Sequence, residues 1–176
     1  MADLLARMRD VAPPAEEEGA ILDLNRVIED LFRLFDKSLF QVRKITAELD
    51  LDKGIPKLSL PAGAVKQILM NLVKNAAEAM SEGGTLRVST RDRIYKNGSQ
   101  YVELQVCDNG PGLPDQILSS LFKPVASTKQ DHAGLGLAIV KNLLDRLSAE
   151  VTCSSATTGT RFQMLLPRTV EKSDQP

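Results

Sequence analysis

Apolar residues recur at helical spacing in three segments of the chain. One face of residues 23–39 carries six of them, Leu24, Val27, Ile28, Leu31, Leu34 and Phe35. Asp23 stands in front of this run as a possible N-cap. Residues 62–80, which begin after Pro61 and are followed by two glycines, and residues 135–148 repeat the helical pattern. The pattern therefore predicts three main helices.

Alternating segments lie between and after these helices. Residues 44–51 place Ile45, Ala47 and Leu49 on one side, as a half-buried strand does. Residues 85–94 and 101–108 flank Asn97-Gly98, a strong hairpin signal, and residues 149–167 contain two more strands around a Thr/Gly turn. Because most neighbouring strands are joined as hairpins, we predict an α/β two-layer sandwich. Its mixed, mostly antiparallel sheet is covered on one face by the three helices.

The chain divides into one globular unit with short flanking segments. Residues 2–11 have a helical apolar spacing that is ended by Pro13-Pro14 and an acidic stretch. We therefore expect residues 1–19 to be the end of a preceding helix with a linker. Residues 20–167 are the expected domain and residues 168–176 the expected tail. A length of 176 residues, 43% of them hydrophobic, suits a single core.

Charge and cysteine content exclude several classes of function. Lys and Arg (22) nearly balance Asp and Glu (23), so nothing in the net charge indicates a nucleic-acid or membrane partner. No apolar run reaches the roughly 20 residues that span a bilayer, and the first residues lack the order of a signal peptide. Cys107, Cys153 and a single histidine do not have zinc-site spacing. We expect a cytoplasmic domain with reduced thiols.

Three polar residues form a stripe on the predicted helix 62–80. Asn71, Asn75 and Glu78 are spaced i, i+4, i+7 and so share one face. A carboxamide oxygen is a suitable ligand for Mg²⁺ alongside phosphate oxygens. An ordinary solvated helix face is the alternative interpretation of this stripe.

The sequence DNGPGLP follows directly on the predicted strand 101–108. Asp108 at the strand end can accept a hydrogen bond from an exocyclic amine, as in adenine. Gly110 and Gly112 let the backbone approach a flat ring without interference from a Cβ atom. A plain Asn-Gly turn is the alternative.

A glycine-rich segment precedes the third predicted helix. Gly134 and Gly136 stand where unpaired backbone N–H groups and the helix dipole favour a phosphate. The dinucleotide fingerprint G-x-G-x-x-G is not met, because Ile139 or Val140 stands where its third glycine would be and a loop precedes the motif. A Rossmann domain is therefore excluded.

Five segments in order resemble the motifs of one family. These segments are NLVKNAAEAM, DNGPGLP, LFKPVASTK, HAGLGLAIV and TTGTRF. They resemble the N, G1, F, G2 and final G-T boxes of the catalytic ATP-binding domain of two-component sensor histidine kinases. That domain belongs to the Bergerat-fold superfamily, with the gyrase, chaperone and mismatch-repair ATPases. The match runs through about residues 21 to 167, and FKPVASTK is most similar to the nitrogen-regulation type.

The resemblance implies an adenine site and a phosphate site. Asp108 would hold the adenine amino group, with Gly110, Gly112 and Thr160 completing that pocket. Asn75 would be the Mg²⁺ ligand and Asn71 a catalytic phosphate-side residue. Residues 123–134 would form a lid whose Lys129 is a second catalytic phosphate contact. The remaining triphosphate contacts would be Gly134, Leu135 and Gly136.

The resemblance also implies the reaction and the partners. The domain would bind ATP and Mg²⁺ and donate the γ-phosphate to a histidine on a separate dimerisation module, and it would act indirectly on a response regulator. In the hydrolytic branch a glutamate stands four positions before the Mg²⁺ ligand, whereas Asn71 cannot act as a base, so hydrolysis should be slow. His132, the only histidine, lies in the lid and is not expected to be the acceptor. Residues 1–19 would then be the end of the dimerisation module.

Three other functions share this fold. One is an anti-sigma-type regulator that phosphorylates a serine on a protein antagonist, which the helix remnant and the two prolines disfavour. Another is an ATPase of the gyrase or chaperone branch, which Asn71 disfavours. The third is a degenerate domain without nucleotide, which Asn75, Asp108 and the glycines disfavour.

Overall fold

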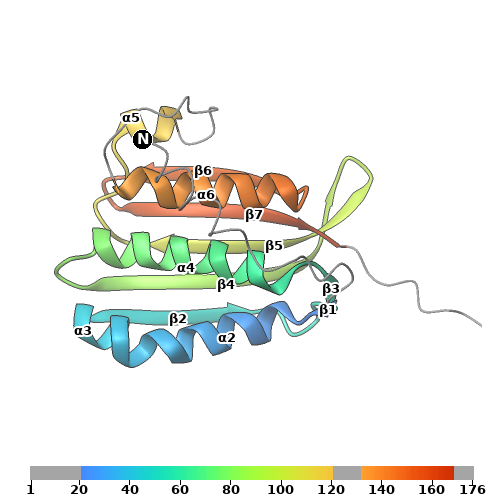
Figure 1. Ribbon diagram of the computed structural model, residues 1–176, viewed down its shortest axis with the longest axis horizontal. Coiled ribbons are helices and arrows are strands. Elements are labelled where there is room, and N and C mark those ends of the chain that lie inside the picture. Colours follow the sequence, from blue (N-terminus) through green and yellow to red (C-terminus); the bar gives the residue numbers. More distant parts are fainter. Residues whose placement is uncertain (1–20, 121–131, 169–176) are drawn as a thin grey trace, which may run out of the picture.

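The computed structural model describes residues 21–120 and 132–168. A five-stranded sheet forms one layer and helices form the other (Figure 1). The strands are β1 (Ile21–Leu22), β2 (Ile45–Leu51), β3 (Leu58–Ser59), β4 (Gly84–Lys96), β5 (Ser99–Asp108), β6 (Glu150–Ala156) and β7 (Gly159–Pro167). The helices are α2 (Leu24–Phe35), the π-helical η1 (Asp36–Phe40), α3 (Gln41–Arg43), α4 (Ala62–Ala79), α5 (Asp115–Ser120) and α6 (His132–Arg146).

The order of strands in the sheet is β2-β4-β5-β7-β6. Only β2 and β4 are parallel, and the other neighbours are antiparallel. Helices α2, α4 and α6 cover the same face of this sheet in Figure 1. The predicted two-layer sandwich with a mixed, mostly antiparallel sheet is therefore confirmed. A separate two-stranded pair, β1 with β3, was not predicted, because two residues are too short to show a period.

The core lies between the sheet and the helices. Alternate residues of the three central strands point into it, namely Leu86, Val88, Val102, Leu104, Val106, Phe162, Met164 and Leu166. The apolar face of α4 packs against them with Val65, Ile68, Leu69, Leu72 and Val73, each at most 2% exposed. Full burial of such side chains contributes about 1.5 to 3 kcal/mol each, so α4 is held firmly in the middle of the domain.

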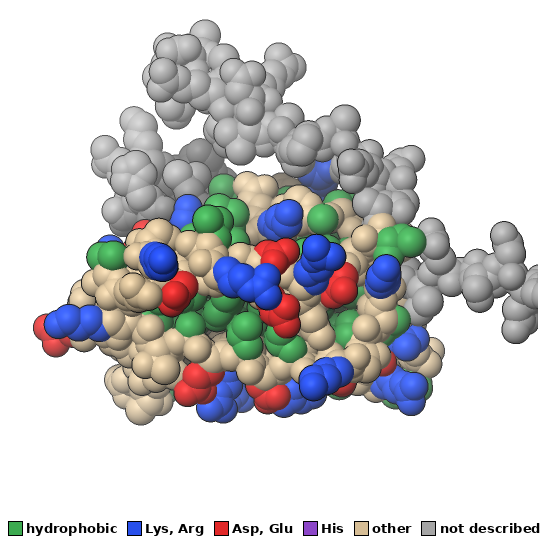
Figure 2. All heavy atoms as spheres, turned by 90° about the horizontal axis from the view of Figure 1, so that it is seen from below, with side chains coloured by type: hydrophobic (Ala, Val, Ile, Leu, Met, Phe, Trp, Pro, Cys, Tyr) green, Lys and Arg blue, Asp and Glu red, His purple; other side chains and the backbone are tan. Residues whose placement is uncertain are grey.

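One predicted core position on α2 was wrong. Leu34 is 65% exposed, whereas Phe32 is 7% exposed and packs against Phe40 with ring centroids 5.2 Å apart. At 100° per residue the two positions lie on opposite margins of the apolar arc, and the aromatic contact turns the helix toward Phe32. On the face of the molecule below α2 and β2, Figure 2 accordingly shows hydrophobic side chains between charged ones.

The predicted hairpin between β4 and β5 is confirmed. Asn97 and Gly98 both have positive φ, 50° and 77°, as the two central residues of a type I′ turn do. The register that follows pairs Leu86 with Asp108, and Asp108 in turn with Thr160 of β7. A register shift between Arg91 and Ile94 separates the turn from this end of the strands, so the hairpin and the shift together set which residues meet at the end of β5.

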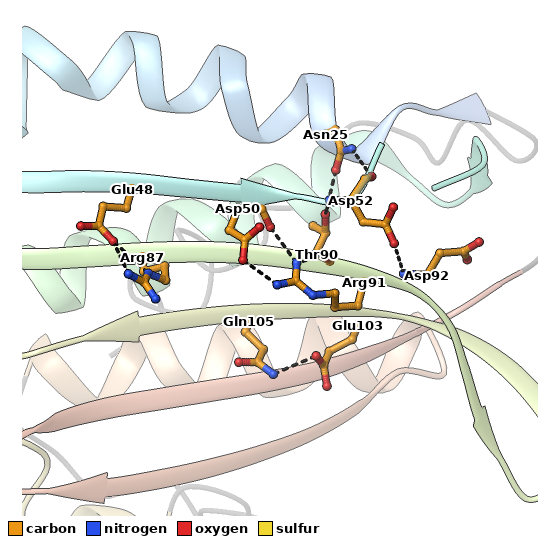
Figure 3. Close-up of polar contacts among 10 residues, drawn as sticks. All are labelled: Asn25, Glu48, Asp50, Asp52, Arg87, Thr90, Arg91, Asp92, Glu103 and Gln105. Atoms are coloured by element: carbon orange, nitrogen blue, oxygen red, sulfur yellow. Dashed lines mark hydrogen bonds and ion pairs between the residues drawn. The ribbon is translucent and has the colours of Figure 1, made fainter. Parts of the chain in front are cut away.

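The uncovered face of the sheet is polar. Arg87 and Arg91 of β4 form ion pairs with Glu48 and Asp50 of β2 at 2.7 and 2.5 Å (Figure 3). These pairs are exposed to solvent, so they contribute little to the stability of the fold. Within residues 21–120 and 132–168, none of the helices has the length and apolar character needed to cross a membrane.

Candidate functional site

Asp108, the last residue of β5, is the centre of the turn DNGPGLP. Its Oδ1 accepts the backbone N–H groups of Gly110 at 2.9 Å and Thr160 at 3.3 Å. Burial raises the pKa of Asp108, and these two hydrogen bonds offset the rise only in part. Among the described residues, no hydrogen bond reaches Oδ2. One carboxylate oxygen is therefore left for an amine of a ligand.

The glycines of this turn are needed by the packing of the turn itself. A methyl group on Gly110 would lie 3.3 Å from Met80 Cγ, at the end of α4. Gly112 has φ +82°, and a methyl group there would lie 2.1 Å from the carbonyl oxygen of Ala156. The turn is therefore pressed against α4 on one side and β6 on the other.

Two further residues hold the turn, and sequence analysis missed both. Asn109 Oδ1 accepts the Thr85 N–H at 2.7 Å, while the Asn109 N–H donates to the Thr85 carbonyl at 3.2 Å. Ser155 Oγ accepts the Leu113 N–H at 2.7 Å. The Asn-Gly pair in the motif could have indicated Asn109, but a single serine in a strand gave no signal.

The polar stripe on α4 divides into a buried part and an exposed part. Glu78 is exposed, while Asn71 and Asn75 are half-buried. Asn71 Nδ2 donates to the Gln67 carbonyl at 2.8 Å. Asn75 Nδ2 is buried and has no hydrogen-bond partner among the described residues. An unpaired buried amide costs about 1 to 3 kcal/mol, so this position favours a polar ligand.

Helix α6 lies against this pair of asparagines. A methyl group on Gly136 would lie 3.4 Å from Asn71 Oδ1 and 3.5 Å from Asn75 Oδ1. Gly136 of α6 therefore lies directly beside both carboxamides, at a distance where an added methyl group would be in ordinary van der Waals contact with them.

The predicted position of the glycine-rich segment was wrong. Gly134 and Gly136 were expected at the very start of a helix over residues 135–148, but α6 already begins at His132 and contains both glycines. Gly136 lies on the side of α6 that faces Asn71 and Asn75 of α4. Gly134 remains in the first turn, where backbone N–H groups lack intrahelical partners.

Other predicted site residues are placed as follows. Thr160 is 6% exposed and contacts Asp108 through its N–H. Lys129 and most of the expected lid lie outside the described residues. Among the described residues, no group of three His, Cys, Asp or Glu side chains could hold a metal ion.

The arrangement has two parts that share α4. Asn71 and Asn75 face α6, and one turn later Ala79 and Met80 face the turn of Asp108. An acceptor for an amine and a pair of carboxamides next to a helix start therefore lie along one helix. This order suits a ligand with a base at one end and phosphates at the other.

Known proteins share both the sequence and the fold. Residues 62–170 match the family model described as histidine kinase-, DNA gyrase B- and HSP90-like ATPase. Over 150 residues the chain is 33% identical to the sensory histidine kinase/phosphatase NtrB of Klebsiella oxytoca, a match that covers 82% of this chain and 42% of that relative. The chain thus spans less than half of that relative's length.

Two solved structures have the same fold. The catalytic domain of histidine kinase ThkA superposes with a TM-score of 0.71 at 25% identity, covering 85% of this chain and 95% of that domain. Histidine kinase ThkA in complex with response regulator protein TrrA gives a TM-score of 0.69 at 23% identity, covering 97% of this chain and 49% of that one. The second likeness shows the fold alone.

Proposed function

Because the chain belongs to the family of histidine kinase-, DNA gyrase B- and HSP90-like ATPases, we propose that it is the ATP-binding catalytic domain of a sensor histidine kinase. It binds ATP with Mg²⁺ and donates the γ-phosphate to a histidine on a separate dimerisation module. The 33% identity to a sensory histidine kinase/phosphatase supports this choice within the family over an anti-sigma-type regulator.

The observation that carries the proposal is the buried, unpaired amide of Asn75. Rotation about the Cβ–Cγ bond exchanges the oxygen and nitrogen of a carboxamide, so this position can offer an oxygen to a cation or an N–H to a phosphate. Gly136 lies beside both asparagines and adds no side chain of its own there. The residues present therefore fit Mg²⁺-ATP, with Asn75 as the protein ligand. When bound, the cation neutralises negative charge on the phosphates.

The side chains near the phosphates favour transfer over hydrolysis. Asn71 is a carboxamide whose nitrogen already donates to Gln67, and it cannot take a proton from water. In the proposed transfer, the bond between the γ-phosphorus and the bridging oxygen breaks and ADP leaves with the electron pair. The unprotonated nitrogen of a neutral imidazole forms the new bond to phosphorus, and the proton on the other ring nitrogen passes to solvent. Asn71 and, in the lid, Lys129 contact the transferred phosphate, and Gly134, Leu135 and Gly136 lie along the triphosphate.

The proposal extends to the flanking segments and to partners. Residues 1–19 are the end of the dimerisation module and a linker, residues 20–167 are the catalytic domain, and residues 168–176 are a tail. The phosphate then passes to a response regulator, by analogy with the complex that the structural relative ThkA forms with response regulator protein TrrA. Because ATP is the donor, the domain works in the cytoplasm.

A binding experiment tests the proposal. In calorimetric titrations with ATP and Mg²⁺, the Asn75→Ala protein should bind more than about tenfold more weakly than the wild type. Lys74→Ala changes an exposed neighbour on α4 and is the matched control. Unchanged affinity of Asn75→Ala, in a variant that unfolds at the wild-type temperature, would contradict the site.

A second experiment tests the reaction. With labelled ATP the isolated chain should hydrolyse nucleotide slowly and acquire almost no label, and label should appear on the histidine of an added dimerisation module. Rapid hydrolysis, or acid-labile label on His132, would favour an ATPase or a self-contained enzyme.

A further inference from the structure

Ser155 joins two parts of the candidate adenine site. It lies on β6 opposite Thr160 of β7, and it is half-buried while its neighbours Ser154 and Ala156 are exposed. Its Oγ lies 2.7 Å from the Leu113 nitrogen, 3.2 Å from Thr160 Oγ1 and 3.4 Å from the Gly159 carbonyl oxygen. One hydroxyl group therefore contacts both the turn after Asp108 and the threonine beside it.

The proton of this hydroxyl has a limited set of acceptors. A serine hydroxyl carries one donated proton and two lone pairs, and the Leu113 N–H occupies one of the lone pairs. The Ser155 hydroxyl can donate to the Gly159 carbonyl at 3.4 Å, and between Ser155 and Thr160, whose oxygens are 3.2 Å apart, either oxygen can be the donor. If Thr160 donates to Ser155, Thr160 presents only lone pairs to a ligand. If Ser155 donates to Thr160, the proton of Thr160 is free for a ligand.

The shape of adenine selects the second arrangement. The amino group of adenine is a donor, and the ring nitrogen N1 beside it is an acceptor. Asp108 Oδ2 can accept from the amino group, so the neighbouring position of the site must offer a donor to N1. The hydroxyl of Thr160 is such a donor, directly or through a water molecule, when its proton is not given to Ser155, and donation from Ser155 to Thr160 ensures this.

We propose that Ser155 is a positioning residue for the adenine base. It makes Thr160 a donor, and through Leu113 it fixes the turn that carries Asp108. This inference rests on the proposed function, since it assumes that adenine lies between Asp108 and Thr160. Ser155 acts through these residues and does not itself contact the base.

The turn after Asp108 packs closely against β6, so the hydrogen bond between Leu113 and Ser155 has a strong effect on the position of the turn. Gly112 already approaches the Ala156 carbonyl so closely that a methyl group on it would lie 2.1 Å away. The N–H group of the next residue, Leu113, donates a hydrogen bond to Ser155 Oγ, and this bond fixes the position of the turn along β6. Loss of the hydroxyl frees the turn without removing any bond that Asp108 itself makes.

The test compares two nucleotides that differ in their hydrogen-bonding edge. Inosine triphosphate has a carbonyl at position 6 and a proton on N1, which reverses the donor and acceptor of adenine. Calorimetric titrations with each nucleotide and Mg²⁺ would use the wild type, Ser155→Ala, Ser155→Thr and the control Ser154→Ala. Ser154 is the exposed neighbour on the other face of β6.

We expect Ser155→Ala to bind ATP about three- to tenfold more weakly, the effect of one neutral hydrogen bond. Its affinity for inosine triphosphate should change little, so the ratio of the affinity for ATP to that for inosine triphosphate should decrease. Ser155→Thr keeps the hydroxyl and should restore the preference, and Ser154→Ala should equal the wild type. Equal weakening toward both nucleotides would instead mean a merely structural role and would overturn the inference.

The outcomes separate this inference from the proposed function. A folded wild type that binds no ATP would refute the proposed function. A wild type that binds ATP while Ser155→Ala keeps its affinity and preference would refute only the role of Ser155. If Ser155→Ala does not fold, Ser155→Cys, whose thiol is a weak donor of similar size, carries the test. A wild-type preference in that variant would overturn the inference.

Discussion

Two aspartates at strand ends, Asp52 and Asp108, have the same kind of partners and opposite pKa shifts. Each accepts two backbone N–H groups, Asp52 from Gly54 and Asp92, and Asp108 from Gly110 and Thr160. The hydrogen bonds from Gly54 and Asp92 lower the pKa of Asp52. Burial raises the pKa of Asp108 in spite of its two bonds. The number of hydrogen bonds alone therefore does not decide the charge state.

The two aspartates differ in how many of their carboxylate oxygens accept hydrogen bonds from the protein. Asp52 places one oxygen on each N–H group, and its main chain is held by Asn25 and Thr90 (Figure 3). Asp108 accepts both N–H groups with Oδ1, and among the described residues Oδ2 accepts none, while burial of the carboxyl group raises its pKa. A structural carboxylate is saturated by its own chain, whereas one that awaits a ligand is not. This contrast separates a structural cluster from a binding site without reference to any motif.

Replacement of each aspartate by asparagine should separate the two roles most strongly. In Asp108→Asn the amide oxygen must serve the N–H groups of Gly110 and Thr160, so the NH₂ group faces the amine of adenine. Two donors then oppose each other, and ATP should bind at least about tenfold more weakly. Calorimetric titration measures the loss, and chemical denaturation of the free protein should show no loss of stability.

Asp52→Asn is the matched control for this prediction. It should keep the affinity for ATP and lower the free energy of unfolding, because an amide cannot accept N–H bonds on both sides. If both variants lost ATP affinity equally, the distinction between saturated and open carboxylates would be wrong.

Thr90→Val should break the structural cluster without reaching the ligand site. Thr90 is fully buried, donates to Asn25 Oδ1 at 3.0 Å and accepts the Asp52 N–H at 3.1 Å. Valine has nearly the same shape but leaves both groups without a partner, at a cost of about 1 to 3 kcal/mol. Denaturant titration measures this loss, and the affinity for ATP should stay within about twofold of the wild type, a margin of about 0.4 kcal/mol. A large loss of affinity would show that the two regions are coupled.

The pH dependence of stability should have opposite signs for the two aspartates. The pKa of Asp108 is raised above its ordinary value of 3.8 in the folded protein, so the carboxyl group ionises less readily there than in the unfolded chain. Its ionisation therefore costs stability at neutral pH, and that cost disappears as the pH falls through the raised pKa. Asp52 contributes stability above pH 3.8, and this contribution is lost as the pH falls through its lowered pKa.

Denaturation from about pH 7 to about pH 3 measures this difference. Asp108→Asn should exceed the wild type in stability at neutral pH and lose its advantage on acidification. Asp52→Asn should be less stable than the wild type at neutral pH, and that deficit should shrink only at the acid end. The same sign for both variants would contradict the opposite shifts.

The sequence predicted the elements with a long, regular period. Helix α4 and the hairpin of β4 and β5 follow directly from apolar spacing and from Asn97-Gly98. The predictions were wrong where the local pattern allowed two nearly equivalent positions and tertiary contacts decide between them. Leu34 and Phe32 lie at the two margins of one apolar arc, and α6 begins at His132, before the residue at which the predicted helix began.

The site itself was predictable only in part. Asn75, Asp108 and Thr160 were named from residue type and from resemblance to a family. The bonds that shape the turn, Asn109 to Thr85 and Leu113 to Ser155, join residues 24 and 42 positions apart. Such pairs follow from the register of neighbouring strands, which no local pattern specifies.

Among these variants, Gly98→Ala should change stability and ATP affinity least. Glycine is favoured at position 98 only because the backbone there has a positive φ, not because space is lacking. Gly98 has φ +77° and Gly112 has φ +82°, but a methyl group on Gly98 meets nothing within 4 Å, whereas one on Gly112 meets the Ala156 carbonyl. Alanine at position 98 should therefore cost only the penalty of the left-handed conformation, about 1 to 2 kcal/mol. Thermal denaturation measures that loss, and ATP affinity should be unchanged because the turn lies at the far end of β5 from Asp108. A loss of affinity in Gly98→Ala would mean that strand register, transmitted along β5, sets the geometry of the adenine site.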